Sequence, residues 1–143
     1  MNDKKMPLLS VEFSLSSDFA DLERITNILE LVPTRTRKKQ DWPQGSRDTG
    51  VACDLWEIST EQETSKSVDE ECKKMINKLR GKEKLIRDLC EEYNMESHFE
   101  VVIHMVNSET PAIYLEKESI YFLSTINADI GFDIYTYEDE EDY

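Results

Sequence analysis

Residues Leu22–Ile58 read LERITNILELVPTRTRKKQDWPQGSRDTGVACDLWEI, and this stretch decides the predicted fold. Apolar residues recur every three or four positions before Pro33, which predicts a helix over Leu22–Val32 that the proline ends. Thr34–Gln40 alternates threonine with arginine before two lysines, a pattern typical of a polar strand at a sheet edge. The apolar segment Cys53–Ile58 is expected to be the next strand and to lie inside the sheet.

The sequence on either side predicts further strands and helices. Leu9–Leu15 alternates apolar and polar residues, which indicates a strand with one buried face. Ser67 and Glu70 form a capping box, in which each side chain bonds the other residue's backbone amide, so they start a helix. The later predicted elements are helices ending at Gly81 and Asn94, a central strand Phe99–Val106, a short extended segment Ile113–Leu115, a helix Glu116–Asn127 that buries Ile120, Phe122 and Leu123, and a strand Ile130–Thr136.

This order of elements predicts the α+β class. We expect a two-layer sandwich with a ferredoxin-like β-α-β-β-α-β core and an extra C-terminal helix and strand. A chain of 143 residues fits one domain, with an ordered core of about residues 8–137 and an acidic tail over residues 138–143. Trp56 and Phe132 are expected in the core.

The net charge of −14 is concentrated in the C-terminal part of the chain. Residues 1–88 hold 17 acids and 16 bases, whereas residues 89–143 hold 14 acids and the single base Lys117. Such a field repels nucleic acid and anionic membranes and attracts basic partners. The alternative interpretation is that the acids only keep the protein in solution.

The cysteines indicate a reducing compartment. Cys53, Cys72 and Cys90 are odd in number, widely spaced and without a C-x-x-C pair, so neither a disulfide framework nor a zinc ribbon is expected. The start MNDKKMPLLS lacks the apolar core of a signal peptide, and no stretch of 18 apolar residues follows. We therefore expect a cytoplasmic protein that neither crosses nor binds a membrane.

No motif for a nucleophile, a phosphate loop or a metal site is found in the sequence. His98 and His104 share one strand face but lie about 20 Å apart, too far to bind one zinc ion, so both are expected to be solvated strand residues. Glu100, Asp129 and Asp133 could share a sheet face and perform acid–base chemistry, although solvated acids are the commoner reading. No catalytic residue, metal or cofactor is predicted.

One basic cluster precedes the turn-rich segment Asp41–Gly50. Arg35, Arg37 and the two lysines that follow lie near Trp42, which could make a platform for single-stranded nucleic acid. The acidic balance of the chain opposes this reading, and charges guarding a sheet edge are favoured. An exposed Trp42 would also suit a protein interface.

The order of several short motifs resembles a known family. These motifs are ITNILELVPTR after the first strand, the loop at Gly45, the strand Trp56-Glu57-Ile58, and the ending ADIGFDIY over Ala128–Tyr135. Together they resemble an uncharacterised bacterial family, domain of unknown function 4279, across Val11–Tyr135. The family loop reads lysine-glycine-acid where this chain has QGS. The resemblance implies no established activity, but some members are similar in size and context to immunity proteins of toxin systems.

The main functional hypothesis is a non-enzymatic protein-binding module of the immunity or antitoxin type. Its acidic C-terminal half would occupy a basic partner such as a toxin, since charge complementarity speeds association. The two alternatives are a self-associating structural domain of undetermined oligomeric state and a small enzyme that uses acids on one sheet face. The candidate partner-binding residues are Trp42, Asp133, Tyr135, Glu138, Asp139, Glu140, Glu141, Asp142 and Tyr143.

Overall fold

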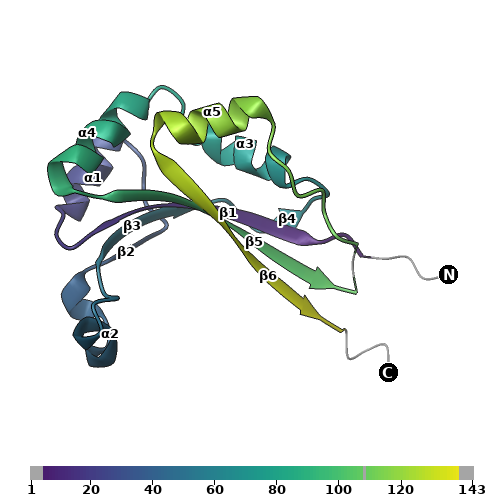
Figure 1. The fold of residues 1–143 in the computed structure, drawn as a ribbon, viewed down its shortest axis with the longest axis horizontal. Helices are drawn as coiled ribbons and strands as arrows, with labels where there is room; N and C mark the ends of the chain where they lie inside the picture. The colour runs from purple at the N-terminus through teal and green to yellow at the C-terminus, as the bar shows by residue number, and fades with distance from the viewer. Residues whose placement is uncertain (1–4, 108, 139–143) are drawn as a thin grey trace.

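The computed structural model describes residues 5–107 and 109–138, which form a six-stranded sheet and five α-helices (Figure 1). A single 3₁₀ turn, Lys39–Asp41, lies between β2 and α2. In chain order the elements are β1 (Leu8–Ser17), α1 (Leu22–Leu29), β2 (Arg35–Arg37), α2 (Gln44–Asp48), β3 (Asp54–Ser59), β4 (Glu63–Thr64), α3 (Val68–Leu79), α4 (Glu83–Tyr93), β5 (Glu96–Val106), α5 (Lys117–Thr125) and β6 (Ala128–Tyr137).

The strand order is β2-β3-β1-β5-β6, with β4 paired to β1 beside this path. All pairs are antiparallel except β5 and β6, which α5 connects. The α+β class is confirmed. A split β-α-β unit has another strand between its two strands, and β1 and β2 flank β3 in this way. The C-terminal strand β6 instead lies directly beside β5, and the order as a whole does not confirm the exact ferredoxin-like topology.

The central strand is β1, which pairs with β3 on one side and β5 on the other. The prediction that Phe99–Val106 lies at the centre is therefore wrong, although that segment does form β5 next to it. The prediction that the Thr34–Gln40 region forms an edge strand is confirmed by β2. Two-sided pairing of β1 explains why its alternate residues, from Leu9 to Leu15, are fully buried.

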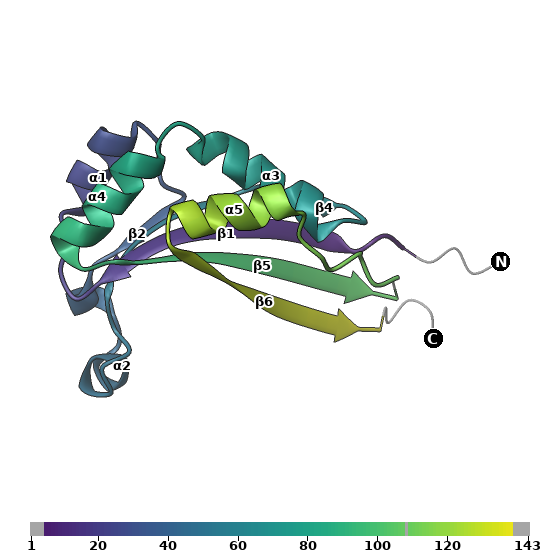
Figure 2. The ribbon, with the colours of Figure 1, turned by 45° about the horizontal axis from the view of Figure 1, so that its top comes forward.

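The helices α1, α3, α4 and α5 lie on one face of the sheet, while α2 projects from the β2–β3 end (Figure 2). The core fills the space between this helical layer and the sheet. Trp56 is fully buried there, as predicted, and its indole N–H donates to the Thr26 hydroxyl at 3.0 Å. Phe13 lies edge-on to both Trp56 and Phe99, which is a favourable arrangement for aromatic rings.

Local capping signals set the ends of α3 and α4. The Ser67 hydroxyl accepts the backbone N–H of Glu70 at 3.2 Å, so this half of the predicted capping box forms and α3 begins at Val68. The Ser67 N–H donates to the Ser65 hydroxyl at 3.2 Å, where the capping box predicted the Glu70 carboxylate as its acceptor. Gly81 has a φ of 87° between the two helices, which an L residue rarely adopts. Asn94 ends α4 in the left-handed region, with a φ of 53°.

The N-terminal half differs from the prediction in two places. Helix α1 ends at Leu29 because Glu30 adopts a left-handed φ of 55°, three residues before Pro33. Val32 is consequently outside the helix and 84% exposed rather than buried. The predicted turn segment Asp41–Gly50 contains the short helix α2, which begins directly after Pro43.

The C-terminal half differs at the sheet edge. Phe132 is 41% exposed rather than buried, because β6 has a neighbouring strand on one side only. Ile120 is also exposed, whereas Phe122 and Leu123 are buried as predicted. The segment Ile113–Leu115 forms no strand.

Two buried carboxylates connect elements that are distant in the sequence. The Asp54 carboxylate accepts the backbone N–H of Ala20 at 3.0 Å and that of Lys39 at 2.7 Å. Asp69, on α3, accepts the backbone N–H of Glu116 and the hydroxyl of Ser119 at the start of α5. A buried carboxylate needs hydrogen-bond donors, so each of these two holds together segments that are distant in the sequence.

Candidate functional site

Acidic side chains gather on the sheet face that points away from α1, α3, α4 and α5. The register pairs Glu12 of β1 with Glu100 of β5, and paired residues share a face. The same register places three further acids on this face: Glu57 of β3, and Asp129 and Asp133 of β6. We call Glu12, Glu57, Glu100, Asp129 and Asp133 the acidic face.

His98 lies within the acidic face and contacts two of its acids. Its Nε2 lies 2.8 Å from Glu100 Oε1, and its Nδ1 contacts the Asp129 carboxylate. Carboxylates only accept hydrogen bonds, so both contacts are satisfied only when both ring nitrogens carry a proton. Desolvation lowers the pKa of His98, but the bonds to Asp129 and Glu100 outweigh it and leave that pKa raised. The imidazolium is thus the positive centre of the acidic face.

Gly131 makes room for this arrangement. It pairs with Glu100 across the parallel β5–β6 ladder. A Cβ at position 131 would lie 2.5 Å from Glu100 Oε1 and 3.3 Å from Cε1 of His98. The absence of a side chain therefore lets the Glu100 carboxylate lie over β6 and reach His98.

Burial and other acids of the acidic face raise the pKa of Glu12. Burial raises the pKa of this carboxyl, and the charges of Glu57, Glu100 and Asp133 raise it further, against a smaller opposing effect of Arg35. Arg35 is itself paired with Glu57, at 3.4 Å. A cation that reached this face would relieve the repulsion between its acids.

Aromatic side chains continue the face toward the end of β6. The Tyr135 hydroxyl donates to the Asp133 carboxylate at 2.7 Å. The Tyr135 ring stacks on His104 with 4.9 Å between ring centroids, and His104 Nδ1 lies 2.6 Å from the Tyr137 hydroxyl. Asp133 and Tyr135, two predicted partner-binding residues, are therefore neighbours on one surface.

The basic cluster after Pro33 is engaged within the fold. Lys38 Nζ donates to the Ala20 carbonyl at 3.0 Å, and Lys39 Nζ pairs with Asp18 at 3.4 Å. The Arg37 guanidinium lies 4.3 Å from the centroid of the Trp42 ring. The cations thus contact groups of the chain itself.

Trp42 does not lie fully open to solvent. Its side chain is half-buried beside Arg37, and its indole N–H is buried without a hydrogen-bond partner among the described residues. Of the predicted acidic tail, only Glu138 is described, and it is exposed. The predicted binding residues Asp139–Tyr143 lie outside the described residues.

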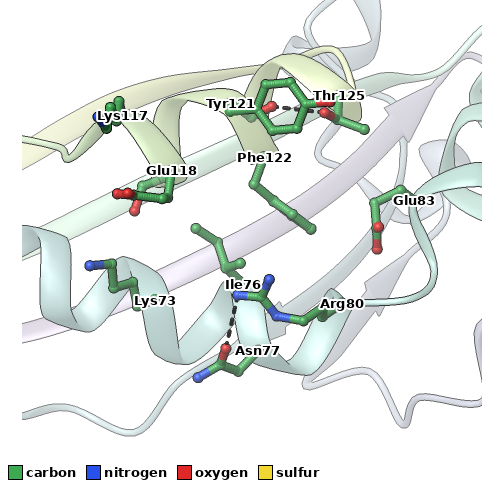
Figure 3. Close-up of a pocket in the computed structure, with 11 residues that line it drawn as sticks. Lys73, Ile76, Asn77, Arg80, Glu83, Lys117, Glu118, Tyr121, Phe122 and Thr125 are labelled. Carbon is green, nitrogen blue, oxygen red and sulfur yellow. Dashed lines mark hydrogen bonds between the residues drawn. The ribbon is translucent and has the colours of Figure 1, made fainter.

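The helical side carries a separate groove of about 800 Å³ between α3 and α5 (Figure 3). Ile76 and Phe122 project into it from the two helices. Its borders carry charges of both signs, namely Lys73, Arg80, Glu83, Lys117 and Glu118. The groove thus differs from the acidic face, where carboxylates predominate.

The acids of the enzyme hypothesis do meet on one surface. Glu100, Asp129 and Asp133 all belong to the acidic face. Asp129 also borders a hollow of about 350 Å³ together with Ser97 and Asn127, but Glu100 and Asp133 do not line that hollow. Among residues 5–107 and 109–138, no three histidine, cysteine or acidic side chains are grouped as metal ligands.

Sequence reasoning missed Glu12 and Glu57 as members of the site. Glu12 was detectable as a residue on the polar side of the predicted Leu9–Leu15 strand. Glu57 lies between Trp56 and Ile58, and only the β1–β3 register shows that it faces the other acids. His98, expected to be a solvated strand residue, is instead the positive centre of the acidic face.

Comparison with known proteins gives one match. A family model described as "Domain of unknown function (DUF4279)" matches residues 7–137. No curated protein and no solved structure matches the chain. Within the described parts of the chain, none of the helices has the length and apolar character needed to cross a membrane.

Proposed function

The chain belongs to the DUF4279 family, and we propose that it is a protein-binding module that captures a basic partner on its acidic face. The observation that carries the proposal is the meeting of five carboxylates from four strands on one sheet face, with Arg35 and His98 among them. Such a surface attracts cationic proteins and speeds their association. We propose an immunity or antitoxin role in the cytoplasm, in which the partner is a basic toxin.

The composition of the face favours protein binding over nucleic-acid binding. Nucleic-acid sites present basic side chains to phosphates, whereas Arg35 is already paired with Glu57 here. Tyr135 stands beside Asp133, and tyrosines are enriched in the well-packed centres of protein interfaces. The acidic face and Tyr135 together are complementary to a partner surface that carries lysine or arginine around an apolar centre.

The first test determines whether the partner binds the acidic face or the C-terminal tail. Full-length protein, a Glu100→Gln/Asp133→Asn variant and a deletion of residues 138–143 are compared in a pull-down from host lysate, eluted along a salt gradient. The double variant should bind the retained basic partner about 5- to 30-fold more weakly, since each lost ion pair contributes about 0.5–1 kcal/mol. It should also elute at lower salt.

A matched control keeps the net charge of that variant. Asp48→Asn/Glu61→Gln removes two charges from exposed positions outside the acidic face, so it should bind like the unmodified protein. If both double variants lose affinity equally, net charge alone governs binding and the acidic face is not the site. If only the deletion loses affinity, the partner binds the tail.

A further inference from the structure

The two edges of the sheet are protected very differently. At one edge, β2 is three residues long and carries Arg35 and Arg37, both of which discourage pairing with another strand. At the other edge, β6 extends over ten residues, and it carries no lysine or arginine. Within residues 5–107 and 109–138, no strand pairs with the outer side of β6 (Figures 1 and 2). Its outward N–H and C=O groups are available to a further strand.

An apolar strip lies along this open edge on the helical side. Phe132 and Ile134 pair with the buried residues Val101 and Ile103 of β5, yet they are 41% and 48% exposed. Ile120 of α5 is 54% exposed. Glu118 lines the groove between α5 and α3. At 3.6 residues per turn, Ile120 lies on the opposite flank of α5, away from that groove. A strand added beside β6 would cover part of this strip.

The other side of β6 belongs to the acidic face. Asp129 and Asp133 alternate along the strand with Ile130, Phe132 and Ile134, because successive strand residues point to opposite sides. Glu100 leans over Gly131 between the two aspartates. A strand beside β6 would therefore meet apolar side chains on one face and carboxylates on the other.

We propose that β6 binds an extended segment of a partner protein in which basic and apolar residues alternate, and that this segment becomes the seventh strand of the sheet. Main-chain hydrogen bonds to the β6 edge supply affinity, and the alternation supplies specificity. The basic side chains pair with Asp129 and Asp133, and the apolar ones cover Phe132 and Ile134. This inference rests on the proposed function and names how the basic partner docks.

Charge favours a basic partner over a second copy of the chain. Two copies joined at β6 would place both sets of aspartates on the same face, and each copy carries a net charge of −14. Antiparallel pairing centred on Asp133 would set two carboxylates directly opposite each other, which destabilises a sheet. A basic strand meets no such repulsion.

The test uses a synthetic peptide of ten residues, the length of β6, with alternating lysine and valine. A control peptide has the same composition in two blocks, so its lysines cannot all lie on one face of a strand. Fluorescence anisotropy should show that the alternating peptide binds about tenfold more tightly. Hydrogen exchange should slow at β6 amides in its presence, and this protection should weaken with added salt.

Variants locate the binding edge. Phe132→Thr and Ile134→Thr place a residue of high strand propensity at each position but remove apolar contact, and each should weaken binding of the alternating peptide about fivefold. Val32→Thr, at an exposed valine outside the strands, should leave affinity unchanged. Circular dichroism of each variant is the control for correct folding.

Three results would overturn the inference. They are equal binding of the two peptides, binding without protection of β6, and protection of β6 that depends on protein concentration when no peptide is present. The last result would show that a second copy occupies the edge. Each of these leaves the acidic face to be judged separately, because the proposed function depends on the Glu100→Gln/Asp133→Asn comparison.

Discussion

Replacing Asp69 by alanine tests how α5 is held on α3. Asp69 Oδ1 accepts two hydrogen bonds from the start of α5, from the Glu116 N–H at 3.0 Å and the Ser119 hydroxyl at 2.8 Å. Its Oδ2 pairs with Lys73 at 3.0 Å. Burial raises the pKa of this carboxyl, but the three partners outweigh burial and leave the pKa lowered.

The expected cost of Asp69→Ala is about 3 kcal/mol of unfolding free energy. Ser119 is 1% exposed, so its hydroxyl would lose its acceptor inside the protein, at about 1–3 kcal/mol. The Glu116 N–H would lose its acceptor as well, at a smaller cost because Glu116 is exposed and water can replace the carboxylate. Lys73 adds little because it keeps the Glu116 carboxylate at 2.5 Å. Domains of this size are stable by only about 5–15 kcal/mol.

Urea unfolding followed by circular dichroism measures this cost. Asp88→Ala is the matched control, because Asp88 is an exposed helical acid paired with the exposed Lys84, and its loss should change stability by at most about 0.5 kcal/mol. In the Asp69→Ala/Ser119→Ala double variant, the unsatisfied hydroxyl is gone, so the two effects should combine to less than their sum.

The pH dependence provides a second readout. A carboxyl with a lowered pKa stabilises the fold above its unfolded pKa of about 3.9, and that stability is lost as the pH falls through the folded value. Asp69→Asn should therefore flatten the acid side of the stability curve. A cost below about 1 kcal/mol for Asp69→Ala, or simple additivity with Ser119→Ala, would refute this account of the α3–α5 contact.

Three further predictions concern His98, Gly131 and Thr26. The raised pKa of His98 means that its protonated form stabilises the fold. Urea unfolding at several pH values should show the unmodified protein to be more stable than His98→Gln below about pH 6.5, and this difference should disappear as the pH rises through the folded pKa. An unchanged difference at high pH would contradict the imidazolium assignment. Gly131→Ala should push the Glu100 carboxylate away from His98 and lower the His98 pKa toward its ordinary value in an NMR titration; a His98 pKa that stays raised would show that the glycine is not required. Thr26→Val keeps the side-chain shape but removes the acceptor of the Trp56 N–H, so urea unfolding should show a loss of about 1–2 kcal/mol, and a neutral result would mean that this hydrogen bond contributes nothing.

Local signals in the sequence predicted the elements that depend on local chemistry. The cap at Ser67 and the apolar spacing after it gave α3 from Val68 to Leu79, because capping and helix periodicity act within a few residues. The alternating threonines and arginines gave the edge strand β2 for the same reason. Helix α1 ended earlier than predicted because Glu30, which no local rule marks as a stop, adopts a left-handed conformation.

The acidic face was only partly predictable, since it depends on register between distant strands. Glu100, Asp129 and Asp133 were grouped from strand periodicity in the C-terminal half. Glu57 joins them because Ser14 pairs with it across β1 and β3, a pairing that no single-strand pattern contains. Phe132 was placed in the core because periodicity shows which side a residue faces but not whether anything covers that side.

The central position of β1 determines when the sheet can be completed during translation. Glu12 pairs with Glu100, so the ribosome must add 88 further residues before this pair can form. At a synthesis rate of about 5–20 residues per second, that interval is about 4–18 s. Throughout it, β1 exposes at least one unpaired edge and the apolar residues between Leu9 and Leu15, which are the features that recruit chaperones or cause aggregation. A nascent chain stalled before β5 emerges should therefore bind holdases, and release should follow once β5 pairs with β1.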